Sequence, residues 1–380
     1  VLIGIDESAQ SAALTDSSGV YPCFGGFGIN AKMIGGWVPG ASPLEMPEYS
    51  ATKISAGSRI VLQMHYHLTQ EAQQDKTGVR VRWTEGTPVM ESSFTLMGND
   101  TSQDENGFGL QGGENDPNTE PEFYIPAGES DHTETMRNQS PNLSYDLKLY
   151  MVANHMHYIG RDMRVWIEKA NDDNECLLHT PEWDFDWQQF YFYDADNNNS
   201  PIISSTDEVW LQCNFDNTLD NPWVVQALQE NGLSEPINVT LGEGSLDEMC
   251  LVVLATVPDI KLRHLEENHS GSFDATISST PLDLNQNCSG PASFMKGDDG
   301  SVEGYTACGL EYNGDLISLE YRYTGTTLGG EVTLNIIGVG EYAGTWIGSE
   351  NSEGFTGIIE IEITVLGAPV DLEGSFSVTQ

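Results

Sequence analysis

Two pairs of histidines have a spacing that suits a transition metal. His155 and His157 lie in the stretch His155-Met156-His157-Tyr158-Ile159-Gly160, and His65 and His67 repeat the spacing. Side chains two positions apart on a strand point to the same face, so each pair would present two imidazoles side by side. Imidazole nitrogen binds copper, zinc, iron and nickel alike. Because the chain has only 8 histidines, two such pairs favour metal binding over a pair of satisfied polar side chains.

Met249, in the stretch Asp247-Glu248-Met249-Cys250, distinguishes between metals. A thioether is a soft ligand that favours Cu(I), so His155, His157 and Met249 together predict a copper site with a redox function. Met249 also begins an apolar run that continues to Val257 and is typical of a buried strand, where methionine is a common core residue. The alternative is therefore zinc or nickel at the two histidines with Met249 in the core.

The composition indicates an acidic protein built from short strands. Among the 380 residues are 39 Gly and 17 Pro, long helical patterns are scarce, and alternating apolar segments predict an all-β fold. The 15 Lys and Arg against 58 Asp and Glu give a formal charge of −43, which disfavours nucleic acid and anionic membranes as partners. No apolar run is long enough for membrane insertion. Acidic loops such as Asp194-Ala195-Asp196-Asn197 could bind calcium through oxygen ligands, although the full twelve-residue loop pattern is absent.

Changes in texture divide the chain. Residues 99–121 form an acidic, glycine-rich segment that marks a candidate boundary, and after about residue 265 short alternating strands and glycine turns predict a separate small β-sandwich or barrel. We expect a Cys288–Cys308 disulfide to close this module at 265–380. Six cysteines without a Cys-x-x-Cys zinc pattern favour disulfides and a secreted, periplasmic or cell-surface location.

Three short motifs resemble those of the copper type II, ascorbate-dependent monooxygenases. This is the family of peptidylglycine α-hydroxylating monooxygenase and dopamine β-hydroxylase. The stretch from His155 to Gly160 is similar to the H-T-H-x-x-G stretch that supplies two ligands of the oxygen-binding copper. Glu248-Met249-Cys250 is similar to the E-M-C stretch that supplies its methionine ligand, and Gln63-Met64-His65-Tyr66 to a Q-x-H-Y stretch that ligates a second, electron-donating copper. The resemblance, to bacterial members in particular, covers about residues 1–258.

The resemblance implies a fold, cofactors and a reaction. It implies two antiparallel, jelly-roll-like β-sandwich domains, at 1–118 with the electron-donating site and at 119–260 with the oxygen-binding site, and a disulfide between Cys213 and Cys250. It implies two mononuclear copper sites, one held by His155, His157 and Met249 and the other by His65. O2 and ascorbate or another reductant would then hydroxylate a C–H bond of a small substrate. The sequence specifies neither that substrate nor an oligomeric state.

Two departures from the family pattern bear on this interpretation. The electron-donating copper also needs an adjacent His-His pair before a strand, and since Val1 begins what looks like that strand, we expect the pair immediately upstream of Val1. Peptide-hydroxylating members place an arginine two residues before H-x-H, where this chain has Ala153, so a glycine-extended peptide is not the expected substrate. The alternative function is a non-catalytic extracellular structural or adhesion protein that retains the double-sandwich scaffold.

Groups that orient the metal-binding imidazoles are expected nearby. The candidates are Tyr158, Gln63 and the aromatic block from Trp183 to Trp187, for which the alternative is an ordinary core role. His67 has no counterpart in the family motif and is interpreted as a neighbour of the site. His132 and His179 are interpreted as surface or hydrogen-bonded residues.

Overall fold

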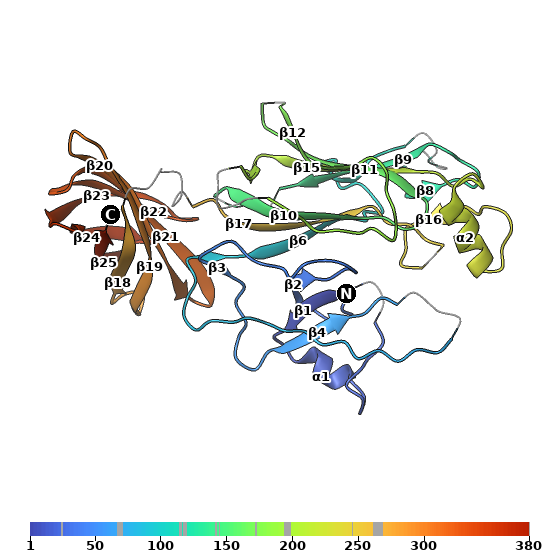
Figure 1. Ribbon diagram of the computed structural model, residues 1–380, viewed down its shortest axis with the longest axis horizontal. Helices are drawn as coiled ribbons and strands as arrows, with labels where there is room; N and C mark the ends of the chain where they lie inside the picture. The colour runs from blue at the N-terminus through green and yellow to red at the C-terminus, as the bar shows by residue number, and fades with distance from the viewer. Residues whose placement is uncertain are drawn as a thin grey trace.

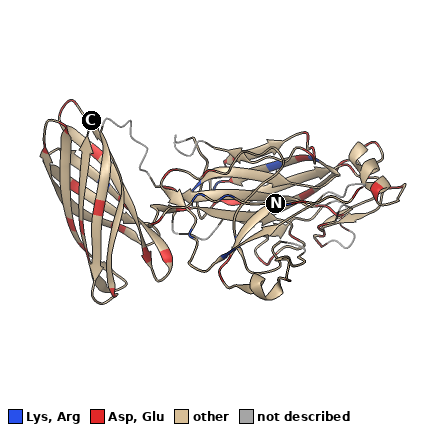
Figure 2. Ribbon diagram, turned by 60° about the horizontal axis from the view of Figure 1, so that its bottom comes forward, with Lys and Arg blue, Asp and Glu red and all other residues tan. Residues whose placement is uncertain are grey.

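The computed structural model describes residues 1–380 with the exception of 24–25, 67–70, 114–115, 117–119, 141–142, 144, 172, 194–198, 245, 261–268 and 380. It shows an all-β protein in three parts, with a barrel at one end, a long sandwich at the other and a small sheet beneath the sandwich (Figure 1). The all-β prediction is therefore confirmed. Acidic residues are scattered along the ribbon and basic residues are few, as the composition requires (Figure 2).

The N-terminal part is a three-stranded antiparallel sheet in the order β2-β1-β4. Its strands are β1 (Leu2–Asp6), β2 (Lys32–Gly36) and β4 (Arg59–Gln63). The short helix α1 (Gln10–Leu14) follows β1, and the buried Asp6 carboxylate accepts hydrogen bonds from Ser11 N at 2.7 Å and Ser11 Oγ at 2.6 Å. Two short strands pair in parallel and lead to the sandwich, β3 (Ser50–Ala51) and β5 (Met90–Glu91).

The central part is a sandwich of two antiparallel sheets. The inner sheet, which faces the N-terminal sheet, has the order β13-β10-β17-β6 with β14 also paired to β10; its strands are β6 (Ser93–Gly98), β10 (Leu147–His155), β13 (Tyr191–Phe192), β14 (Ile202–Ile203) and β17 (Leu251–Pro258). The outer sheet has the order β12-β11-β15-β9-β7; its strands are β7 (Gly109–Leu110), β9 (His132–Gln139), β11 (Gly160–Glu168), β12 (Asn174–Thr180) and β15 (Glu208–Phe215).

One end of the sandwich is closed by a helix and a small ribbon. Helix α2 spans Pro222–Glu230 and has a proline in its first turn. Asn221 caps its N-terminus, because the Asn221 side chain accepts a hydrogen bond from Trp223 N at 3.1 Å. The ribbon pairs β8 (Tyr124–Ile125) with β16 (Val239–Thr240). This end carries the turn between β10 and β11.

The two central strands of the inner sheet, β10 and β17, are buried on both faces, which explains their largely apolar sequences. All residues of β10 from Leu147 to Asn154 are buried. Leu149 and Val152 belong to the core between the two sheets. Tyr150 and Ala153 belong to a second core, which also includes Tyr305 of the C-terminal barrel. Met33 and Leu44 of the N-terminal part pack against this core.

The C-terminal part is a closed barrel of eight antiparallel strands that follow one another in chain order. They are β18 (His269–Ser279), β19 (Leu284–Lys296), β20 (Ser301–Tyr312), β21 (Asp315–Thr326), β22 (Gly329–Ile336), β23 (Gly340–Glu350), β24 (Gly354–Val365) and β25 (Ala368–Thr379). In β25 buried and exposed residues alternate at every position, as expected for a strand with one face inside a barrel.

Aromatic side chains fill the barrel interior. Phe376 stacks on Phe294 with ring centroids 4.5 Å apart and contacts Trp346 at 5.5 Å, and Phe273 packs on Tyr321 at 4.9 Å. All five are buried. The interior is therefore a packed core, as in other eight-stranded barrels whose side chains occupy the lumen.

The barrel docks on the segment that joins the N-terminal part to the sandwich. Ser318 Oγ donates to Val89 O at 2.7 Å, and Lys53 Nζ lies 2.7 Å from Glu311 Oε1. A Cβ at Gly309 would lie 1.9 Å from Pro88 O, so only glycine permits this approach of the two backbones.

The C-terminal barrel runs from His269 to Thr379, and its Cys288–Cys308 disulfide joins β19 to β20 as predicted. The N-terminal part is a three-stranded sheet, and β6 and β7, which precede the expected boundary at 118, pair with β17 and β9 of the sandwich. In the part of the chain that the structure describes, no helix is long and apolar enough to cross a membrane.

Candidate metal centre

The two histidines of the H-x-H stretch meet at the turn between the two sheets of the sandwich. His155 is the last residue of β10, and His157 lies in the turn that leads into β11 at Gly160. Their ring centroids are 5.2 Å apart and the ring planes are 81° apart. The expected proximity is therefore present, but a turn produces it, because the strand ends before the alternation reaches His157.

A glycine is required where this turn ends. A Cβ at Gly160 would lie 2.9 Å from Met156 Cβ and Cε, because the Met156 side chain folds beneath this residue. Met156 is fully buried in the core between the sheets. The glycine of the motif and the methionine between the histidines are thus explained by packing.

His155 is held by an amide side chain. Its Nδ1 lies 2.8 Å from Gln188 Oε1, and Gln188 Nε2 donates to Phe185 O at 2.9 Å. Because an amide oxygen can only accept, Nδ1 carries the proton and the lone pair is on Nε2. Burial, together with the neighbouring His157, lowers the pKa of His155 to about 3, so the ring is neutral.

His157 is held in the same tautomer by the main chain. Its Nδ1 donates to Asp247 O at 2.9 Å, which leaves Nε2 as the free nitrogen. Burial lowers the pKa of His157 below its usual value. Two neutral imidazoles with free Nε2 atoms are the form in which histidine binds a metal.

Met249 lies at the same end of the inner sheet. The β10–β17 ladder pairs His155 with Leu251, two residues after Met249, and the Met249 side chain is buried. Cys250 forms the predicted disulfide with Cys213 of β15, which ties this end of the inner sheet to the outer sheet. Asn99 holds the same point, because its Oδ1 accepts from Cys250 N at 2.8 Å and its N donates to Cys250 O at 2.9 Å.

The segment from Trp183 to Gln188 covers the two histidines. Trp183 Nε1 donates to His157 O at 3.0 Å, and the Trp183 ring lies 6.3 Å from the His155 ring. The Phe185 ring lies 6.4 Å from the His157 ring. Trp183 and Gln188 are therefore the side chains of this block that orient the site. Gln188 ends the block as an amide side chain after three aromatic residues, which is the signal that could have singled it out.

The other candidates for orienting groups have different surroundings. The Tyr158 ring stacks between Phe185 and Trp223 of α2, with centroids at 4.4 and 6.0 Å. Gln63 is buried in β4, within the N-terminal sheet.

His65 belongs to the same neighbourhood. It follows β4 in the N-terminal part, and its charge contributes to the lowered pKa of both His155 and His157. The pKa of His65 is itself lowered by partial burial. His67 lies outside the described residues, as does the acidic stretch 194–197 suggested for calcium.

The donor set at the turn is small. Within the described ranges, no group of three or more His, Cys, Asp or Glu side chains is arranged to hold a metal ion. A metal at His155 and His157 would thus take its third protein ligand from Met249, whose thioether sulfur favours Cu(I). The residues present fit copper better than zinc, which prefers nitrogen, thiolate and carboxylate ligands.

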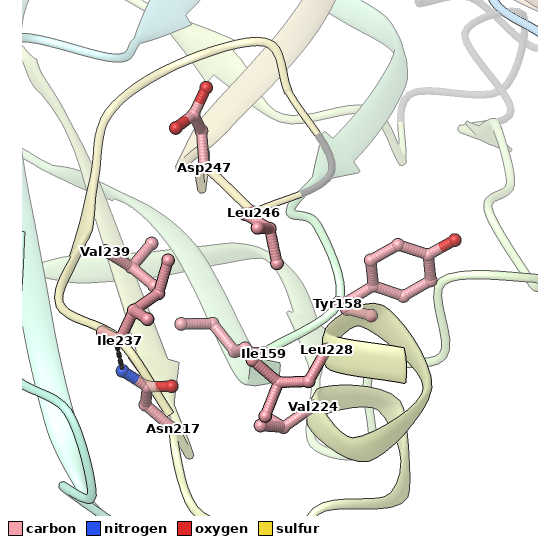
Figure 3. Close-up of a pocket in the computed structure, with 10 residues that line it drawn as sticks. Tyr158, Ile159, Asn217, Val224, Leu228, Ile237, Val239, Leu246 and Asp247 are labelled. Atoms are coloured by element: carbon pink, nitrogen blue, oxygen red, sulfur yellow. Dashed lines mark hydrogen bonds between the residues drawn. The ribbon is translucent and has the colours of Figure 1, made fainter. Parts of the chain in front are cut away.

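A small pocket lies behind the turn, between α2 and the segment that leads to Glu248 (Figure 3). Apolar side chains from several elements converge in it, including Ile159, Leu228 and Val239. Asp247, whose carbonyl binds His157 Nδ1, is part of its lining. None of the three proposed metal ligands is among the residues that line this pocket.

Two further histidines, His132 and His179, lie against carboxylates, and two cysteines are free thiols. His132 Nε2 lies 2.8 Å from Glu134 Oε1 inside the sandwich, and His179 Nε2 lies 2.7 Å from Asp162 Oδ2. Both histidines are hydrogen-bonded as expected, and His132 is buried. Cys23 and Cys176 are exposed free thiols.

Comparison with known proteins gives no family assignment. No protein-family model matches the chain, and no curated protein matches it significantly.

Proposed function

We propose that the protein is a secreted, copper-dependent monooxygenase with its oxygen-reacting site at His155, His157 and Met249. The observation that carries this proposal is the fixed tautomer of both imidazoles. Gln188 and Asp247 O bind the two Nδ1 atoms, and neither Nε2 atom has a hydrogen-bond partner among the described residues; both histidines lie at the end of the sheet where Met249 lies. The two disulfides fit an oxidising compartment.

Copper bound here would supply Cu(I)/Cu(II) redox chemistry and the activation of O2. In the overall reaction one oxygen atom enters a C–H bond of the substrate and the other leaves as water, with two electrons and two protons from a reductant such as ascorbate. The chain's own contribution is to keep both imidazoles neutral by burial and to shield one face with Trp183 and Phe185. The substrate is a small molecule bearing the C–H bond. His65 is the ligand that we assign to a second, electron-donating copper.

The test is copper loading of the whole chain, followed by ascorbate-dependent O2 consumption. We expect Met249→Leu, a substitution of similar volume, to remove the sulfur signal from the copper X-ray absorption spectrum and to abolish O2 consumption. Met156→Leu is the matched control, because Met156 is buried in the same turn but packs beneath Gly160. Absence of copper binding by the wild-type chain would favour the structural or adhesion alternative, and tight zinc binding without dependence on reductant would favour the zinc alternative.

A further inference from the structure

Glu248 is a fully buried carboxylate that connects the two segments bearing the proposed ligands. Its Oε1 accepts hydrogen bonds from Met249 N, at 2.8 Å, and from His157 N. Its Oε2 accepts from Ile159 N at 3.2 Å. One side chain thus binds the main chain of both the H-x-H turn and the methionine segment. Glu248 and His157 are 91 residues apart in the sequence.

The sheet itself does not hold these two segments together. The ladder between β10 and β17 ends at the pair His155 and Leu251. His157 lies beyond that last pair on one side, and Met249 lies beyond it on the other. The relative position of His157 and Met249 therefore depends on bonds made outside the ladder, and Glu248 makes bonds to both residues.

The bonding pattern suits a side chain with two acceptor oxygens. Main-chain N–H donors face both oxygens of Glu248, whereas a glutamine would turn an NH2 group toward one set of donors. In the described part of the chain Glu248 forms no ion pair, and main-chain N–H groups are its partners. Burial raises the pKa of Glu248 to about 8, and these N–H groups act in the opposite direction.

We propose that Glu248 is a positioning residue that fastens the His157 turn to Met249 and so sets the separation of the nitrogen and sulfur ligands. This inference rests on the proposed copper site. The free Nε2 of His157 and the thioether of Met249 keep a constant geometry because the same carboxylate holds the main-chain nitrogens of both residues.

Glu248→Gln, which keeps the volume, tests this role, with Glu248→Asp as a second variant that keeps the carboxyl group but shortens the side chain. Asp6→Asn is the matched control, because Asp6 is also a buried carboxylate that accepts main-chain and side-chain hydrogen bonds, but in the N-terminal sheet. Three quantities are measured on the intact chain: Cu(I) affinity by competition with a chromophoric chelator, the copper–sulfur signal in X-ray absorption, and hydrogen exchange of the Ile159 and Met249 amides without copper.

We expect both Glu248 variants to bind Cu(I) about 10- to 100-fold more weakly, with a reduced sulfur signal, which is the usual effect of removing a group that orients a ligand. The Ile159 and Met249 amides should exchange faster in both variants and stay unchanged in Asp6→Asn. Wild-type affinity and sulfur signal in a folded Glu248 variant would overturn the positioning role while leaving the copper site intact. Failure of both variants to fold would also overturn it, in favour of a purely structural role. If the wild-type chain binds no Cu(I), the proposed function fails, and the amide exchange still shows whether Glu248 fastens the two segments.

Discussion

Removal of the Cys213–Cys250 disulfide should weaken the connection between the two sheets of the sandwich next to Met249. Cys213 lies in β15 of the outer sheet, and Cys250 lies between Met249 and β17 of the inner sheet. Both cysteines are fully buried. We therefore expect the double variant C213A/C250A to lose stability and also to hold Met249 less firmly beside His155.

The size of the stability loss follows from the length of the closed loop. The two cysteines are 37 residues apart, and the entropy of closing such a loop in the unfolded chain corresponds to about 4 kcal/mol at 25 °C. The matched control is C288A/C308A in the barrel, where a separation of 20 residues corresponds to about 3 kcal/mol. Urea unfolding followed by circular dichroism and calorimetry, with separate transitions for sandwich and barrel, measures both losses.

Copper binding separates the two variants. We expect C213A/C250A to lower Cu(I) affinity and C288A/C308A to leave it unchanged, because only the first disulfide adjoins Met249. Equal Cu(I) affinity in the two variants, together with the expected stability losses, would refute the reasoning that this disulfide helps to place the thioether. A loss well below 1 kcal/mol for C213A/C250A would refute the loop-entropy argument itself.

Three further predictions follow from individual contacts. Gln188→Leu removes the acceptor for His155 Nδ1 and should weaken Cu(I) binding about 10-fold or more in a chelator competition, whereas unchanged binding would show that another group fixes the ring. Hydrogen bonds from Ser11 hold the pKa of Asp6 below its usual value, so this carboxylate stabilises the fold above about pH 4 and the stabilisation is lost as the pH falls. Asp6→Asn should therefore flatten the acid limb of a plot of unfolding midpoint against pH, and a slope like that of the wild type would contradict this assignment. Phe376→Ala should destabilise the barrel by about 3–5 kcal/mol in calorimetry without changing Cu(I) affinity, and a change in affinity would show that the barrel acts on the site.

The order of apolar and polar residues along the chain predicted the all-β class, and the positions of cysteines and histidines predicted one disulfide and one pair of imidazoles. Alternating apolar residues predicted the strands of the barrel, because one side of each strand must face a core, and in β25 the alternation is complete. The texture change near residue 265 located the third part, and the Cys288–Cys308 disulfide followed from two cysteines in one small module. The spacing of His155 and His157 predicted that two imidazoles lie together, although a turn and not the expected strand alternation brings them there.

The tertiary structure decided what lies around those imidazoles. Gln188 and the carbonyl of Asp247 reach the two Nδ1 atoms from segments 33 and 90 residues away in sequence, and no local pattern encodes such contacts. The assignment of β6 to the sandwich likewise depends on its pairing with β17, across more than 150 residues. A sequence specifies periodicity and residue type within a segment, whereas the direction of a lone pair on Nε2 is set by whichever distant group bonds the other ring nitrogen. For this reason the histidine pair could be predicted from the sequence, and the state in which it could bind copper could be described only from the fold.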